Sequence, residues 1–299
     1  MNAATADIQE NHTLSLGSRI GAYIELTKPR IAFMLVLTAA AGFYVAADKG
    51  FDLFLFFNSM AAIALLAFGV AALNQYFERE TDKLMERTAS RPLPSGRITP
   101  LEGLMVGSVL TLGAEIYLFA AVNTLTAILG IMVVVGYVFL YTPLKTRTTA
   151  STAIGAIPGA MPPLMGWTSA ANDISLSAWF LFATLFLWQF PHFLAIAWMY
   201  REQYRKAGIR MLPVVDEAGT VTVRQIVTFT VMLLPVSVAP FFFGISGLVF
   251  LFGATILGIW FLIVSIQMAR AKNFKMARKL LLVSVVYLPV FFALMVLGR

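Results

Sequence analysis

Residues 53–77 read LFLFFNSMAAIALLAFGVAALNQYF, an apolar stretch without a single charged side chain. It is longer than the roughly 20 residues that an α-helix needs to cross the hydrocarbon core of a bilayer. Comparable apolar windows stand near 31–47, 101–120, 124–142, 150–170, 175–200, 225–243, 246–268 and 278–297. Lipid offers an open backbone no hydrogen-bond partners, and these runs lack the alternation of barrel strands, so they predict about nine transmembrane helices.

The composition agrees with a membrane protein. Hydrophobic residues make up 59% of the 299 residues and charged residues 12%, a balance that one soluble core of this size could not bury. We therefore expect an all-α, polytopic membrane helix bundle around a central cavity. Residues 1–18 lack the apolar core of a signal peptide and are expected to form a flexible tail, with 19–299 as a single transmembrane domain.

The basic residues orient this bundle. Roughly 20 of the 22 Lys and Arg fall in loops on one predicted face, and only Lys49 and Arg299 fall on the other. The positive-inside rule makes the basic face cytoplasmic, with the N-terminus inside and the C-terminus outside. The net charge of +7 is explained by juxtamembrane loops, which indicates membrane lipid rather than nucleic acid as a partner. The absence of cysteine excludes disulfides and cysteine metal sites.

A polar array follows the second apolar window. Asn74, Glu78 and Asp82 recur every four residues and so share one face of a helix. Oxygen ligands suit Mg2+, which proteins usually hold with one or two carboxylates together with the phosphates of a substrate. The alternative is a solvated helix end whose acids pair with nearby basic residues such as Lys83. Polar groups at membrane depth are costly, which favours the functional interpretation.

Basic side chains follow this array. The loop 87–97 contains prolines and a glycine and presents Arg87, Arg91 and Arg97. Arginine suits bidentate contact with phosphate, so beside the carboxylates this loop indicates a diphosphate clamp. Lys145 and Arg147 end another helix on the same face. They are candidate phosphate contacts, although membrane orientation explains them equally well.

A second distinctive stretch, WQFPHF at 188–193, leads into a loop with Glu202, Gln203 and Tyr204. His192 is the only histidine inside a predicted span. It is either a structural hydrogen-bonding group or one that binds a ligand or transfers a proton. Glu202 would supply an acid facing the first array, unless it pairs with a neighbouring arginine.

These motifs resemble the UbiA superfamily of intramembrane prenyltransferases, in particular the branch that acts on haem. The resemblance runs from 27–30 to the last apolar window and is most specific at 74–91, 141–145 and 188–213. It implies a UbiA-like fold and transfer of a farnesyl group from farnesyl diphosphate to the vinyl group of protohaem IX (haem B). The product would be haem O for haem–copper oxidases. Haem B would be a substrate rather than a permanent cofactor, and Mg2+ the cofactor.

The motifs and the resemblance together nominate the site residues. We expect catalytic roles for Asn74, Glu78, Asp82 and Lys145; metal binding by Asn74, Glu78, Asp82 and Glu202; and substrate binding by Arg87, Arg91, Arg97, Arg147, His192, Glu202, Gln203 and Tyr204. Two departures from the family pattern stand out. Glu78 replaces a common aspartate, and Gln203 replaces an aspartate beside Glu202, which depletes the second loop of acid.

Two other functions stay open at this point. One is prenylation of an aromatic quinone precursor, for which the diphosphate site would look the same. The other is secondary transport, which would rest on Glu115 as an isolated acid within a span. The resemblance further implies the bacterial cell inner membrane, active-site loops on the cytoplasmic side, and haem A synthase or oxidase assembly proteins as partners.

Overall fold

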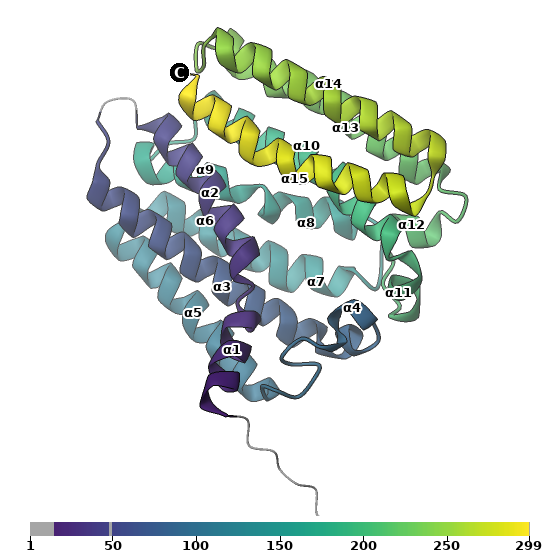
Figure 1. Ribbon diagram of the computed structural model, residues 1–299. Coiled ribbons are helices and arrows are strands. Elements are labelled where there is room, and N and C mark those ends of the chain that lie inside the picture. Colours follow the sequence, from purple (N-terminus) through teal and green to yellow (C-terminus); the bar gives the residue numbers. More distant parts are fainter. Residues whose placement is uncertain (1–14, 48–49, 299) are drawn as a thin grey trace, which may run out of the picture.

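The computed structural model describes residues 15–47 and 50–298, and these form helices and connecting loops without a strand (Figure 1). Eight helices are long and apolar enough to cross a membrane, which confirms the predicted all-α membrane bundle. They are α2 (Pro29–Ala46), α3 (Leu53–Lys83), α5 (Pro100–Ala121), α10 (Leu176–Met199), α13 (Thr220–Phe242), α14 (Leu248–Ala271), α15 (Phe274–Leu297) and a continuous helix of α6 (Thr124–Val134), π-helical η1 (Val135–Tyr141) and α7 (Thr142–Leu144).

The window 150–170 differs from the prediction because it is not one helix. It forms α8 (Ser151–Gly159) and α9 (Met161–Ala171), which meet at Ala160. At 1.5 Å per residue neither reaches the roughly 30 Å of the hydrocarbon core alone, but the two together do. Figure 1 shows them one after the other across the bundle. Pro158, Pro162 and Pro163 explain the break, since proline removes a helical hydrogen bond and crowds the preceding turn.

Four short helices accompany the spans. They are α1 (Leu16–Leu26), α4 (Glu86–Ala89), α11 (Arg201–Lys206) and α12 (Leu212–Val215). The first of these begins inside the predicted tail 1–18, so residues 16–18 are helical; residues 1–14 lie outside the described residues. Lys49 and Arg299, the two basic residues predicted on the opposite face, also lie outside them.

Small residues bring α2 close to α9. A Cβ atom added at Gly166 would lie 1.8 Å from the backbone oxygen of Ala39, and one at Gly42 would lie 2.1 Å from that of Pro163. Only glycine allows this approach, which is how small residues commonly serve in membrane helix packing. The close packing fixes α2, whose N-terminal end reaches the polar face of the bundle.

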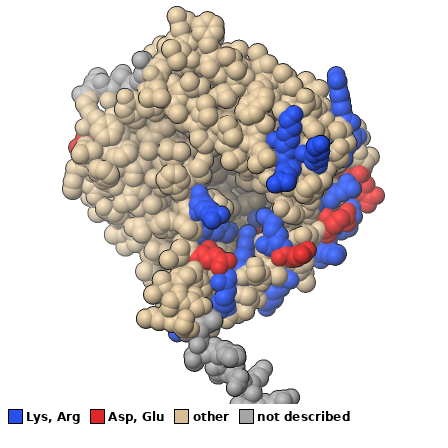
Figure 2. Space-filling view, viewed as in Figure 1, with Lys and Arg blue, Asp and Glu red and all other residues tan. Residues whose placement is uncertain are grey.

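Charged side chains gather at one end of the molecule. Figure 2 shows Lys and Arg grouped around a hollow, with the remaining surface in this view almost free of charge. The short helices α4, α11 and α12 lie at this end in Figure 1, opposite the C-terminal end of α15. The charged groups around the hollow therefore lie at the end of the bundle that carries α4, α11 and α12.

Candidate active site

The last three turns of α3 carry the predicted array. Asn74 and Asp82 are each 1% exposed, and the Glu78 side chain is 12% exposed. The 3.6-residue repeat of the helix stacks the three on one face. The structure therefore brings together one amide and two carboxylates.

Each carboxylate of the array has a basic partner from another segment. Arg91 Nη1 lies 2.7 Å from Asp82 Oδ2, and Lys145 Nζ lies 2.5 Å from Glu78 Oε1. Burial alone would lower the pKa of Lys145, but the neighbouring Glu78 carboxylate and the Tyr141 and Tyr137 rings hold it well above its ordinary value. Arg91 and Lys145, two of the predicted phosphate contacts, thus form ion pairs with two of the predicted metal ligands.

The amide of the array also has a basic partner, which the sequence did not nominate. Lys28 Nζ donates a hydrogen bond of 2.9 Å to Asn74 Oδ1, while Asn74 Nδ2 donates to Thr142 Oγ1 at 3.2 Å. Lys28 caps the start of α2 with φ 50° and ψ 57°, in the left-handed region. Burial, and next the charge of Arg91, lower its pKa to about 7. The matching segment 27–30 of the family resemblance was the available signal for this residue.

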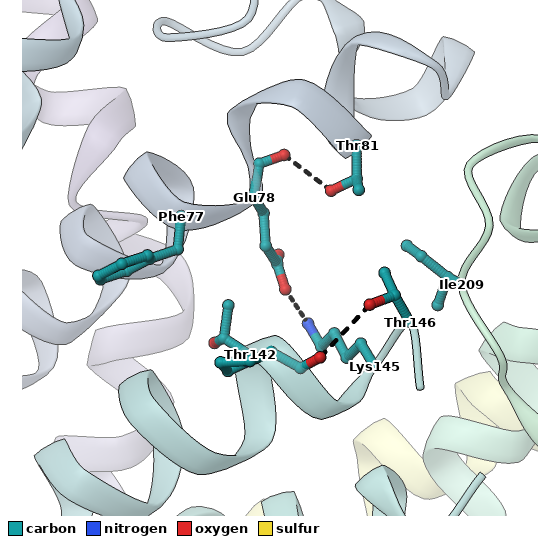
Figure 3. A pocket seen from close by; sticks show the side chains of 8 residues that line it. Phe77, Glu78, Thr81, Thr142, Lys145, Thr146 and Ile209 are labelled. Carbon is teal, nitrogen blue, oxygen red and sulfur yellow. Dashed lines mark hydrogen bonds and ion pairs between the residues drawn. The ribbon is translucent and has the colours of Figure 1, made fainter. Parts of the chain in front are cut away.

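A cavity of about 270 Å3 opens beside the array (Figure 3). It is lined by Phe77, Glu78, Thr81, Thr142, Pro143, Lys145, Thr146 and Ile209. In Figure 3 the Glu78 carboxylate points toward the Lys145 ammonium, and Ile209 reaches in from the second loop. The cavity therefore combines charged groups and hydroxyls with apolar walls.

The second loop contacts the first through one arginine. The backbone N–H of Arg87 donates to Gln203 Oε1 at 3.2 Å, and its Nη2 donates to Tyr204 Oη at 3.0 Å. The guanidinium also lies 5.0 Å from the centre of the Tyr200 ring, a cation–π distance. Gln203 thus joins two loops as a neutral acceptor.

Three other nominated residues lie away from the array. Arg97 Nη2 pairs with Glu25 at 2.7 Å, and the Arg147 side chain is exposed. Glu202 is 62% exposed and pairs with Arg205 at 2.7 Å, the pairing that the sequence left as the alternative. The structure does not bring these three side chains into contact with Asn74, Glu78 or Asp82.

His192 stands at the junction of α10 and α15. Its Nδ1 lies 2.8 Å from Ser284 Oγ, and its ring stacks on Trp188 with centroids 4.6 Å apart. Trp188 Nε1 donates to the backbone oxygen of Ser284 at 2.8 Å. The imidazole is therefore held in a fixed orientation.

A second cavity of about 560 Å3 lies between α2, α3 and α15 and is lined almost entirely by apolar side chains. Leu37 in its wall stands nine residues after Lys28 along α2, about 14 Å at the helical rise. The same helix thus touches the polar array at its N-terminal end and an apolar cavity farther along.

The donor set of the array suits a hard cation. Within residues 15–47 and 50–298 no three His, Cys, Asp or Glu side chains gather as a metal site. Two carboxylates and an amide oxygen are too few for a cage made by the protein alone, but they match Mg2+, which takes further ligands from water and substrate phosphates.

Comparison with known proteins identifies relatives along most of the chain. The model of the UbiA prenyltransferase family matches residues 35–295. A protohaem IX farnesyltransferase from Solibacter usitatus (strain Ellin6076) is 46% identical over 286 residues, which cover 93% of this chain and 98% of that protein.

Solved structures share the fold. A structure described as digeranylgeranylglyceryl phosphate synthase superposes with a TM-score of 0.78 at 18% identity, over 94% of this chain and 98% of the other. A UbiA homolog from Archaeoglobus fulgidus bound to DMAPP and Mg2+ superposes with a TM-score of 0.64 at 14% identity, over 91% of this chain and 98% of the other.

Proposed function

The chain belongs to the UbiA prenyltransferase family, and we propose that it transfers the farnesyl group of farnesyl diphosphate to a vinyl group of protohaem IX, yielding haem O. The observation that carries the proposal is the 46% identity, along 93% of the chain, with a protohaem IX farnesyltransferase. The family resemblance read from the sequence is thereby confirmed. Membership in a prenyltransferase family also decides against secondary transport.

The array on α3 is proposed as the diphosphate end of the active site. Asn74, Glu78 and Asp82 would hold Mg2+, as their donor set fits, and Arg91 and Lys145 would contact the diphosphate. The Archaeoglobus fulgidus homolog with bound DMAPP and Mg2+ supports the use of a divalent metal in this family. When bound, Mg2+ supplies positive charge that stabilises the departing diphosphate.

The residues of the chain then serve a reaction in which charge separates. The bond between C1 of the farnesyl group and the diphosphate oxygen breaks, and the diphosphate leaves with both electrons. Arg91 and Lys145 are preorganised cations for the negative charge that develops there. The vinyl group attacks the allylic cation, and water adds to the resulting haem-side cation and loses a proton. The apolar walls delay premature capture of the farnesyl cation by water.

The acceptor end is proposed near α10, α2 and α15. His192, held by Ser284, is the candidate contact for the haem. The apolar cavity lined by Leu37, Tyr44 and Phe292 offers room for an apolar part of a substrate. Both substrates have a large apolar part, which fits an active site within a membrane bundle.

The location and partners are proposed on the same basis. The protein is a multi-pass integral membrane protein, which we place in the bacterial cell inner membrane with the array on the cytoplasmic side. Haem A synthase or oxidase assembly proteins would receive the product.

A product assay tests the proposal. Purified protein in nanodiscs is incubated with haem B, farnesyl diphosphate and Mg2+, and the porphyrin is analysed by mass spectrometry. We expect a haem that has gained one farnesyl group and one hydroxyl group. An aromatic quinone precursor is offered in parallel; if it is prenylated while haem B stays unmodified, the proposed acceptor is wrong.

A further inference from the structure

Each member of the α3 array, Asn74, Glu78 and Asp82, contacts a basic side chain. Lys28 meets the Asn74 amide oxygen at 2.9 Å, Lys145 meets Glu78, and Arg91 meets Asp82 at 2.7 Å. The three basic residues come from three separate parts of the chain: the start of α2, the end of α7 and the loop after α4. They converge on the oxygens proposed to bind metal.

This arrangement leaves little attraction for a free divalent cation. The two carboxylates are matched by two cations, and Lys28 is a third basic group at the same face. A metal ion arriving alone would have to displace these partners into a buried space, where an uncompensated charge is costly. A metal ion arriving with a diphosphate brings anionic oxygens to which the displaced groups can turn.

We propose that Lys28, Lys145 and Arg91 exchange partners, from Asn74, Glu78 and Asp82 in the empty protein to the diphosphate in the loaded one. The proposal rests on the diphosphate site of the proposed function. It makes Lys28 a substrate-binding residue, and it means that Mg2+ and farnesyl diphosphate bind as a coupled pair.

Burial explains why the empty site needs these partners. Asp82 is 1% exposed, and the side chains of Lys145 and Arg91 are 16% and 24% exposed. A buried carboxylate without a partner loses its solvation and gains nothing in return. The basic groups therefore serve the empty state by neutralising the array, and serve the loaded state by binding the leaving group.

Binding measurements without haem test the exchange, because no turnover occurs. Mg2+ alone, and farnesyl diphosphate in EDTA or in excess Mg2+, are titrated by calorimetry into the full-length protein in detergent. Formation of the Mg2+–diphosphate complex in solution is subtracted. We expect weak binding of Mg2+ alone, measurable binding of farnesyl diphosphate in EDTA, and at least about tenfold tighter binding when both are present, a typical coupling between linked ligands.

Lys28→Met is the diagnostic variant, and Lys83→Met is its matched control. Lys83 belongs to the same end of α3 but is exposed and pairs with Glu80 at 3.0 Å. Lys28→Met frees the Asn74 oxygen, so Mg2+ alone should bind more tightly. It should also weaken farnesyl diphosphate binding in EDTA by about tenfold, the value of one charge-assisted hydrogen bond. Lys83→Met should change neither affinity.

The outcomes are distinguishable from those of the product assay. Equal Mg2+ affinity of the wild type with and without farnesyl diphosphate would overturn the exchange even if the protein makes haem O. Identical affinities in Lys28→Met and Lys83→Met, with both proteins folded, would overturn it too. Coupled binding with a different prenyl acceptor would support the exchange while refuting the haem assignment. If Lys28→Met does not fold, the wild-type titrations alone decide.

Discussion

Asp82 is both a proposed metal ligand and one partner of a buried ion pair, so its substitution should affect both catalysis and stability. It is 1% exposed and pairs with Arg91 at 2.7 Å. Removing one partner of a buried ion pair leaves the other charge uncompensated, which typically destabilises a protein by about 3–5 kcal/mol. Loss of activity in a single variant would therefore not separate the two roles.

Asp82→Asn should lower farnesyl transfer by roughly 100-fold or more, as expected for loss of a group that stabilises transition-state charge, and should lower the melting temperature as well. The double variant Asp82→Asn with Arg91→Gln removes both charges, so its melting temperature should recover while transfer stays low. Recovery of transfer together with stability would make the pair structural. Arg79→Lys is the control, because Arg79 bonds to the backbone oxygen of Tyr76 and should stay active.

The second loop gives another comparison between adjacent residues. Gln203 accepts a hydrogen bond from the Arg87 backbone, whereas Glu202 is 62% exposed and pairs with Arg205. Gln203→Ala should therefore raise the KM for farnesyl diphosphate by about fivefold, the worth of one hydrogen bond. Glu202→Gln should change it less, since exposed ion pairs contribute little. Abolished Mg2+-dependent transfer in Glu202→Gln would instead support Glu202 as the metal ligand that the sequence predicts.

At the scale of helices, the contact between α2 and α9 fixes where Lys28 stands. A Cβ at Gly166 would lie 1.8 Å from the backbone oxygen of Ala39. A backbone oxygen cannot move aside as the end of a flexible side chain can, so the helices themselves would have to separate. Overpacking of a helix interface commonly costs about 1–3 kcal/mol.

Gly166→Ala should accordingly lower the melting temperature by several degrees and weaken farnesyl diphosphate binding, because α2 is pushed away from the array. Gly113→Ala is the matched control. Gly113 lies in α5 with nothing within 4 Å of its added Cβ, and alanine favours a helix. Scanning fluorimetry of both proteins decides, and equal melting temperatures would contradict the close approach.

For the whole molecule, sidedness follows from the number of crossings. Eight long helices and the α8–α9 pair give an odd number of membrane crossings. The start of α2 and the end of α15 therefore lie on opposite sides of the membrane. A reporter fused after Arg299 should be extracytoplasmic, and one inserted at the exposed Ser95 should be cytoplasmic. Both reporters on one side would mean that α8 and α9 do not cross together.

Much of this architecture could be predicted from hydropathy, because each span must satisfy its backbone within itself. The α3 array was also predictable, since its four-residue repeat fixes a shared face. Lys28 was not, because a lone lysine before a helix looks the same as a charge that sets orientation. The place of Glu202 depends on how its loop turns, which the spacing of residues along the sequence does not reveal; its side chain pairs with Arg205.

The backbone of Lys28 adds a consequence for evolution and engineering. Its φ of 50° is a conformation that glycine adopts freely and that costs a lysine roughly 1–2 kcal/mol. Lys28→Gly removes this backbone cost but also the hydrogen bond to Asn74, so its melting temperature should stay close to that of the wild type while farnesyl diphosphate binding weakens. A lower melting temperature would contradict this trade-off. Selection for stability alone would therefore tolerate glycine at position 28. Selection for turnover would retain the lysine despite its strained backbone.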